Sequence, residues 1–363
     1  LARAKNSYAG LAGGNHAGIF WHMARPAVTL PAGRQVLPYL IVGLVAFGLV
    51  MVGNASVVDA ARDFGDKWYY LKLQAGWAGI GLVGFWFMSR LPYRKLAHLA
   101  KMGFVITLVL LVAVLIPGFS SRILGARRWL NLGLFSFQPA ELAKLTLVIY
   151  WAALLSKSRN VFWPFVTSIA LVTGLVMLEP DLGTTVILIG TGLMMYFGSG
   201  GKLKPILLGT PVFLLIAAGL IFISPYRRDR LMTYFDRTRD PLGTSYHIRQ
   251  VLLSLGSGGI GGVGLGQSRQ KYEFLPEVTT DSIFAVVGEE LGLIGTSAVI
   301  LAFLFLFWAG MKVVKSTDDQ FGANLALGLT GWIMLQALVN IAAMVALVPL
   351  TGIPLPFISY GGS

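Results

Sequence analysis

Long apolar segments dominate this chain and constrain its fold more than any other feature. A helix needs about 20 mostly apolar residues to cross the hydrocarbon core of a membrane, and nine stretches reach or approach that length. Only 12% of the 363 residues are charged, against roughly 25% in soluble domains. We therefore expect an all-α polytopic membrane protein. The predicted spans cover residues 37–53, 69–89, 102–117, 139–156, 161–178, 184–199, 206–224, 282–314 and 321–348.

The spans divide the chain into two parts. Residues 1–36 are rich in Gly and Ala, contain no acidic residue, and predict a flexible cytoplasmic tail. Residues 37–363 form the transmembrane domain, in which residues 349–363 resemble the start of a tenth span. The eighth span, at 282–314, is long enough to include a partly buried leading segment or to be a tilted helix. The chain contains no cysteine, which excludes disulfides and thiolate chemistry.

The positions of the basic residues predict the orientation in the membrane. With a cytoplasmic N-terminus, the inner segments are 1–36, 90–101, 157–160, 200–205 and 312–320. These segments hold 14 Lys or Arg and two Asp residues, whereas the rest of the chain holds 15 basic and 14 acidic residues. This asymmetry follows the positive-inside rule and accounts for the net charge of +13 without a nucleic-acid partner. The two longest loops, 118–137 and 225–281, then lie on the outer side. A loop as long as the second is uncommon and usually functional.

The loop at 225–281 keeps eight basic residues on the outer side, where basic residues are normally few. Arginine binds phosphate oxygens with a planar fork, so a phosphorylated or pyrophosphorylated substrate is one explanation. Ion pairing with the six acidic residues of the same loop is the other. Within the loop, residues 246–253 predict an amphipathic helix at the membrane interface. The Gly-rich stretch 256–266 predicts tight turns rather than a nucleotide-binding loop.

Ionisable residues in or beside the spans are costly in lipid and usually functional. Glu141 and Lys144 are three residues apart, so they share a helix face and can pair, which a purely structural role also explains. Asp281 lies where the long loop enters the eighth span. There it is the N-cap of that helix, a carboxylate that accepts a proton from a substrate hydroxyl, or both at once. Glu179 and Asp181 lie where two spans meet on the outer side, and Glu289 and Glu290 lie within the eighth span.

Six ordered motifs carry a resemblance to a known family. The strongest is Leu275-Pro276-Glu277-Val278-Thr279-Thr280-Asp281-Ser282-Ile283-Phe284-Ala285, followed by Glu289-Glu290-Leu291-Gly292. The others begin at Gly125, Phe137, Glu179, Asp240 and Gly352. Together they resemble the SEDS family (shape, elongation, division and sporulation) over essentially everything after residue 37.

The resemblance implies an enzyme of about ten transmembrane helices in the bacterial cytoplasmic membrane, which polymerises lipid II into glycan strands on the outer face. It also implies a class B penicillin-binding protein as the cross-linking partner, beside other division proteins. The family's essential aspartate falls on Asp281, the expected general base of an inverting transfer, and its modulating glutamate on Glu273. The candidate substrate-binding residues are Arg127, Arg128, Gln138, Glu141, Lys144, Arg249, Lys271, Glu273 and Ser359.

No cofactor is required by this chemistry, although a divalent cation, Mg²⁺ or Mn²⁺, would assist the departure of the pyrophosphate. Arg127, Arg128 and Arg249 are candidates for the same task. Residues 264–273 and 336–340 look closer to the division branch of the family (FtsW) than to the elongation branch (RodA), which predicts a place at the division septum. A lipid II flippase, an elongation-type polymerase and a recruiting scaffold are the alternatives, although the short inner loops offer little material for a transport path.

Overall fold

Helices account for most of the structure. The computed structural model describes residues 32–118, 120–123, 126–131, 136–157, 161–223, 228, 232–235, 244–272 and 275–361. All nine predicted spans fall on helices. These are α1 (Ala32–Ala55), α3 (Tyr69–Arg90), α4 (Arg94–Leu115), α5 (Pro139–Leu155), α6 (Phe162–Leu178), α7 (Leu182–Gly198), α8 (Leu203–Ile223), α11 (Ile283–Ser316) and α12 (Gln320–Met344).

Several helices begin before the apolar runs that predicted them, whereas α12 ends at Met344, before the end of the predicted span at 348. Helix α4 begins at Arg94 and carries Lys95 and Lys101 in its first two turns, before the predicted span at 102–117. Helix α1 begins at Ala32 and therefore includes the last residues of the predicted tail. Among the described helices, α1, α4, α11 and α12 are long and apolar enough to cross a membrane, and α6 and α7 are shorter apolar helices.

The segments between the spans contain structure that hydropathy did not predict. Helix α2 (Val57–Phe64) is a short helix after α1. A small antiparallel sheet follows α4, formed in the order β1 (Ser120–Ile123), β2 (Ala126–Asn131) and β3 (Ser136–Phe137). Helix α10 (Thr244–Gly258) confirms the predicted helix of the long loop. Its Ile248 and Val251 are buried, so α10 lies against α11 rather than only on lipid.

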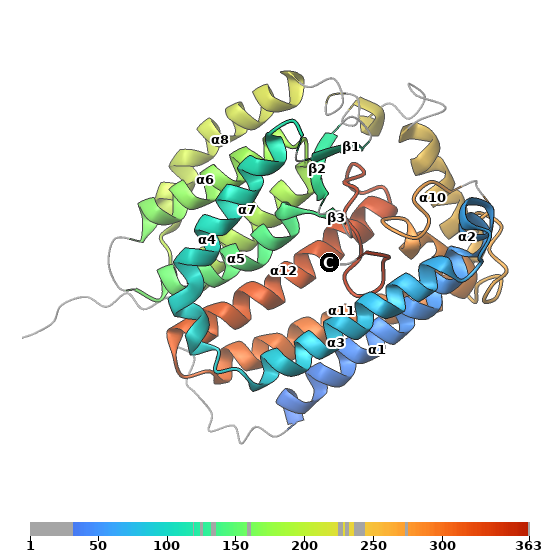
Figure 1. Ribbon diagram of the computed structural model, residues 1–363, viewed down its shortest axis with the longest axis horizontal. Coiled ribbons are helices and arrows are strands. Elements are labelled where there is room, and N and C mark those ends of the chain that lie inside the picture. Colours follow the sequence, from blue (N-terminus) through green and yellow to red (C-terminus); the bar gives the residue numbers. More distant parts are fainter. Residues whose placement is uncertain are drawn as a thin grey trace, which may run out of the picture.

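Helix α12 joins two hydrophobic cores. One core combines α1, α10, α11 and the C-terminal end of α12. The other combines α4, α5, α6 and α7 with the N-terminal part of α12. Figure 1 shows α12 crossing the middle of the molecule between these groups. Because α12 contributes to both cores, its position fixes one group of helices relative to the other.

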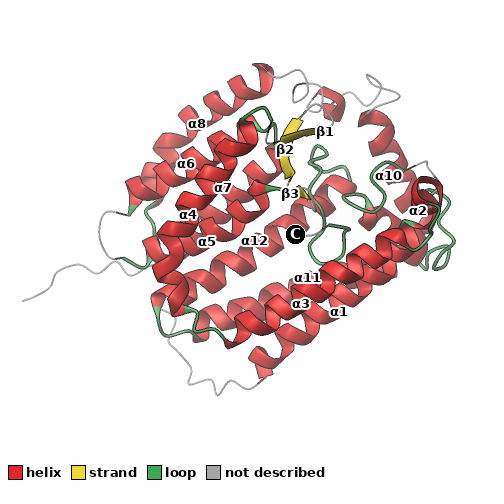
Figure 2. Ribbon diagram, in the orientation of Figure 1, coloured by secondary structure: helices red, strands yellow, loops and turns green. Residues whose placement is uncertain are grey.

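The C-terminal segment 345–361 folds back into the molecule instead of continuing α12. It lies between α12 and the α1–α3 pair, at the centre of Figure 2. Gly48 of α1 brings its backbone against Phe357 and Ile358, and an added Cβ would lie 2.4 Å from the Phe357 carbonyl oxygen. The Gln74 side chain of α3 donates to the Ser359 carbonyl oxygen and accepts from the Gly361 amide. These contacts tie the segment to both helices.

The close packing of α12 on α5 and α7 makes a specific prediction for stability. A Cβ at Gly328 would lie 2.6 Å from both Met195 of α7 and Val148 of α5. Overpacking of this kind costs about 1–3 kcal/mol. We expect Gly328→Val to lower the midpoint of thermal unfolding in detergent. Gly79→Val, on α3 with nothing within 4 Å, is the matched control and should leave the midpoint unchanged. Equal midpoints for the two variants would contradict this packing.

Candidate functional site

Asp281 lies at the start of α11, as the sequence predicted, but it does not cap the helix. The N-cap position is held by Ser282, and no side chain caps it. The N-cap explanation of Asp281 is therefore wrong, because the helix begins one residue later than it requires. Asp281 is 7% exposed. Its backbone carbonyl accepts a hydrogen bond from Asn340 Nδ2 of α12 at 2.9 Å.

The backbone around Asp281 is strained. Glu277 and Phe357 are not glycines, yet their φ angles are 50° and 66°. Positive φ values at such residues cost of order 1–3 kcal/mol and concentrate at functional sites. Glu277 belongs to the Asp281 loop, and Phe357 belongs to the C-terminal segment that contacts this loop. Two of the four described non-glycine residues with positive φ thus lie in the two segments that meet at Asp281.

Glu141 and Lys144 form the predicted ion pair and lead towards the same region. The Lys144 ammonium lies 2.7 Å from the Glu141 carboxylate and is almost completely buried. It also donates to Gln336 Oε1 of α12 at 3.0 Å. Gln336 Nε2 in turn donates to the Pro354 carbonyl oxygen at 3.1 Å. A continuous chain of polar contacts therefore connects α5, α12 and the C-terminal segment.

Helix α11 is broken at Gly292, where φ is 64° and ψ is −158°. The part before the break, residues 283–291, is the buried leading segment that the length of this span predicted. The Gly-rich turns fit against the break. Val263 N and Gly264 N donate to the carbonyl oxygens of Glu289 and Glu290, at 2.9 and 3.0 Å. The turn prediction is confirmed for residues 259–266, whereas 256–258 are the last residues of α10. The turns supply hydrogen bonds that the broken helix lacks.

The side chains of Glu289 and Glu290 hold the same loop from the inside. Glu289 accepts hydrogen bonds from the Ser254 and Ser268 hydroxyls and from the Arg269 amide. Glu290 is fully buried and lies 3.5 Å from the Lys271 ammonium. Asn54 of α1 bonds to both Glu290 and Lys271. This cluster joins α1, α10, α11 and the Gly-rich turns.

A third polar group lies between α6 and α7. The Arg128 guanidinium of β2 donates to the Glu179 and Pro180 carbonyl oxygens, at 3.0 and 2.6 Å. Asp181 caps α7 through the Thr184 amide and accepts from Gln138 Nε2 at 3.3 Å. The Glu179 carboxylate is buried, and neither of its oxygens has a hydrogen-bond partner among the described residues. Burial, together with the charge of Asp181 and against that of Arg128, raises the pKa of Glu179 to about 9.

The predicted site residues therefore separate into distinct groups. Asp281 and Ser359 lie together, because the Ser359 hydroxyl donates to the carbonyl oxygen of Thr280, and Glu141 and Lys144 reach the neighbouring Pro354 through Gln336. Arg128 and Gln138 lie at the α6–α7 turn, and Lys271 is enclosed with Glu290. Arg249 is an exposed residue of α10. The side chain of Arg127, and Glu273 as a whole, lie outside the described residues. The substrate-binding roles of these residues stay predictions.

The cation expected as an aid to pyrophosphate departure finds no ligand cluster in the described part of the chain. No group of three or more His, Asp or Glu side chains there could hold a metal ion. Glu289 and Glu290 are adjacent, but they are bound to Lys271, Asn54 and serine donors.

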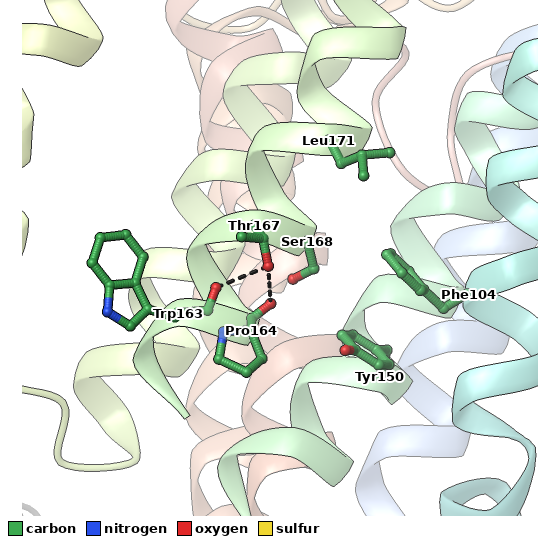
Figure 3. A pocket seen from close by; sticks show the side chains of 7 residues that line it. All are labelled: Phe104, Tyr150, Trp163, Pro164, Thr167, Ser168 and Leu171. Atoms are coloured by element: carbon green, nitrogen blue, oxygen red, sulfur yellow. Dashed lines mark hydrogen bonds between the residues drawn. The ribbon is translucent and has the colours of Figure 1, made fainter. Parts of the chain in front are cut away.

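A cavity of about 410 Å³ lies between α4, α5 and α6 (Figure 3). Aromatic and aliphatic groups line it, and its Thr167 hydroxyl is turned to the helix carbonyls of Trp163 and Pro164. Tyr150 is nine residues beyond Glu141 on α5, which corresponds to about 13 Å along the helix. This cavity is therefore separate from the polar groups described above, and it contains none of the predicted site residues.

The sequence did not predict roles for three polar residues, two on α12 and one on α10. Asn340 and Gln336 lie one turn apart on α12 and both hold the C-terminal segment. His247 of α10 forms a hydrogen bond with the Ser282 hydroxyl, beside Asp281, at 2.7 Å. A polar residue in an apolar helix was the available signal, since lipid disfavours uncharged amides as well as charges.

The fold and this centre define a multi-pass membrane protein that holds a buried carboxylate at the end of a broken helix. The chain belongs to the FtsW/RodA/SpoVE family, because the sequence profile described as "Cell cycle protein" matches residues 34–363. It is 39% identical to stage V sporulation protein E of Bacillus subtilis (strain 168) over 327 residues, 88% of this chain and 89% of that protein. It is 37% identical to the probable peptidoglycan glycosyltransferase FtsW of Trichlorobacter lovleyi over 335 residues, covering 90% and 88%.

Solved structures show the same fold. A chain described under "Structural coordination of polymerization and crosslinking by a peptidoglycan synthase complex" superimposes with a TM-score of 0.74 at 28% identity, covering 90% of this chain and 92% of that one. The rod shape determining protein RodA of Thermus thermophilus gives a TM-score of 0.65 at 27% identity, with 90% of each chain covered. The predicted family and the predicted multi-pass helical fold are thus confirmed.

The buried Lys271–Glu290 pair predicts a large effect of removing one partner. Lys271→Met leaves the Glu290 carboxylate buried without its cation, and such changes cost about 3–5 kcal/mol. We expect a marked fall in the midpoint of thermal unfolding in detergent. The double variant Lys271→Met/Glu290→Gln removes both charges and should recover most of the loss. If the double variant were as unstable as the single one, the ion pair would not be the cause.

Glu179 predicts a pH dependence of stability. Its carboxyl is protonated in the folded protein up to pH about 9, whereas in the unfolded chain it ionises near its ordinary pKa. Between these two pKa values the folded state binds one proton more than the unfolded state. The free energy of unfolding is therefore highest at low pH and falls as the pH rises to about 9, by up to about 1.4 kcal/mol per pH unit. We expect thermal unfolding at pH 6 to 9 to show this slope for the wild type and a flatter one for Glu179→Gln. Parallel curves would contradict the assignment.

Proposed function

We propose that this protein is a peptidoglycan glycosyltransferase that polymerises lipid II at the outer face of the bacterial cytoplasmic membrane. The observation that carries the proposal is the buried carboxylate of Asp281 where the long loop meets the broken helix α11. Family membership and the names of the FtsW relatives support the reaction class. The substrate, an anionic glycolipid with its sugar outside the membrane, matches a polar centre at the end of apolar helices.

In the proposed reaction, Asp281 acts as the general base. Its carboxylate takes the proton of the acceptor GlcNAc 4-hydroxyl as that oxygen forms a bond to the anomeric carbon of the donor MurNAc. The bond from this carbon to the pyrophosphate oxygen breaks, and undecaprenyl pyrophosphate leaves with the electron pair. Direct displacement inverts the α linkage to β, which needs one base and no covalent intermediate. The buried position of Asp281 strengthens its electrostatic interaction with the reacting hydroxyl.

Basic side chains would stabilise the charge that develops on the departing pyrophosphate. Arg249 suits this role because it is exposed on α10, the helix that packs on α11 beside Asp281. Arg128 donates two of its N–H groups to carbonyl oxygens. It would therefore act by holding the α6–α7 turn, with any remaining N–H groups directed to the substrate.

We place the protein in the division branch of the family, at the septum, with a class B penicillin-binding protein as its cross-linking partner. The names of the FtsW relatives support this branch, and the stage V sporulation relative keeps a sporulation role open. Similarity to a chain of a peptidoglycan synthase complex supports the transpeptidase partner. An elongation role would instead be indicated by recovery of rod shape, rather than septation, in a depleted host.

Asp281→Asn tests the proposed chemistry. The amide keeps the size of the side chain but cannot accept the proton, so we expect loss of glycan polymerisation by at least about 10²-fold. The measurement is gel electrophoresis of the products from purified protein and lipid II, with and without the transpeptidase partner. Thermal unfolding of the variant should match that of the wild type.

Asp66→Asn is the matched control for this substitution. Asp66 is a half-buried acid in the segment between α2 and α3, paired with Lys72 at 2.7 Å. This variant should produce the same ladder of glycan products as the wild type. Normal polymerisation by Asp281→Asn would refute the base assignment. The absence of polymer from every preparation, with transport of lipid II across vesicles instead, would favour a flippase.

A further inference from the structure

The Asp281 loop is held in place through three successive carbonyl oxygens, each of which accepts a hydrogen bond from another segment. The Thr279 oxygen accepts from the Tyr360 amide at 2.8 Å, and the Thr280 oxygen accepts from the Ser359 hydroxyl. The Asp281 oxygen accepts from Asn340 Nδ2. The first two donors belong to the C-terminal segment, whereas Asn340 belongs to the membrane helix α12. The backbone direction at Asp281 is therefore set by residues distant in the sequence.

Asn340 uses both hydrogens of its amide nitrogen at this junction. Nδ2 donates to the Asp281 carbonyl oxygen at 2.9 Å and to the Ile353 carbonyl oxygen at 2.8 Å. A primary amide nitrogen carries two hydrogens, so its donor capacity is fully used. Asn340 is 1% exposed, so bulk solvent does not compete for these hydrogen bonds. One residue thus joins three segments, namely the Asp281 loop, α12 and the C-terminal segment.

Gln336 extends this arrangement one helical turn earlier on α12. It donates to the Pro354 carbonyl oxygen, next to Ile353, and accepts from the Lys144 ammonium. Residues four apart lie on the same helix face. The face of α12 that carries Gln336 and Asn340 therefore binds two consecutive carbonyl groups of the C-terminal segment. These two attachments fix the position of Asn340 relative to Asp281.

We infer that Asn340 is a positioning residue for Asp281, which sets the direction of its carboxylate by holding its backbone carbonyl. This inference rests on the proposed function of Asp281. A general base must reach its hydroxyl within hydrogen-bond distance, and a misplacement of about 1 Å can reduce the rate about 10²-fold. Removing the Asn340 amide would leave two buried carbonyl oxygens without their donor, so the loop would move to satisfy them.

The test compares the kinetics of lipid II polymerisation by three variants. Asn340→Leu keeps a similar volume and removes both donors, so we expect kcat to fall about 10- to 100-fold while KM stays within about two-fold. Asn340→Ser keeps one hydroxyl donor and should lie between Leu and the wild type. Asn324→Leu is the matched control on the same helix. Asn324 is also buried, and its Nδ2 has no partner among the described residues, so kcat should be unchanged.

The outcomes separate the inference from the function on which it rests. A selective, graded fall in kcat that follows the number of donors supports the positioning role. Unchanged kcat in Asn340→Leu would overturn it, because the two donors would then not affect the reaction. A parallel rise in KM, or an equal loss in Asn324→Leu, would also overturn it, because general damage to the helix produces both. If Asn340→Leu does not fold, Asn340→Ser decides by the same criteria. An inactive wild type, or an active Asp281→Asn variant, would overturn the proposed function itself.

Discussion

The structure depends on hydrogen bonds to the backbone groups of its non-helical segments inside the membrane protein. Lipid offers no hydrogen bonds, so non-helical segments persist at this depth only where protein groups bind them. Here the kink at Gly292, the Gly-rich turns and the C-terminal segment all meet that condition. The donors and acceptors come from neighbouring backbone and from a few buried side chains, such as Glu289 and Asn340. The polar centre exists because these groups replace water.

The sequence predicted the helices well, since the requirement for a long apolar run is one-dimensional and can be read directly. It did not predict the extension of α4 through Arg94 and Lys95, because basic residues outside the hydrocarbon core continue a helix without adding to its hydropathy. The small sheet β1–β3 was also missed. Its strands are short, and their pairing is decided by contacts with other segments rather than by periodicity.

The centre was predicted in part. The location of Asp281 followed from its position between a long loop and an apolar helix, whereas its cap role was wrong because Ser282 occupies that position. The pairing of Glu141 with Lys144 followed from their spacing. The partner of Lys271 could not be predicted, since Asn54 and Glu290 are separated by more than two hundred residues and meet only through packing. The role of Asn340 was not predicted, because a single amide is a weaker signal in an apolar run than a charged group.

The break in α11 has a mechanical consequence. An unbroken helix is a stiff rod, so a change in its tilt at one membrane surface is carried to the other. At Gly292 this hydrogen-bond ladder is interrupted, but the Gly-rich turns bind both sides of the break. They donate to the carbonyl oxygens of Glu289 and Glu290 and accept from the amides of Leu293 and Ile294. A change in the tilt of the span would have to break these bonds, so the turns couple the span to the polar centre.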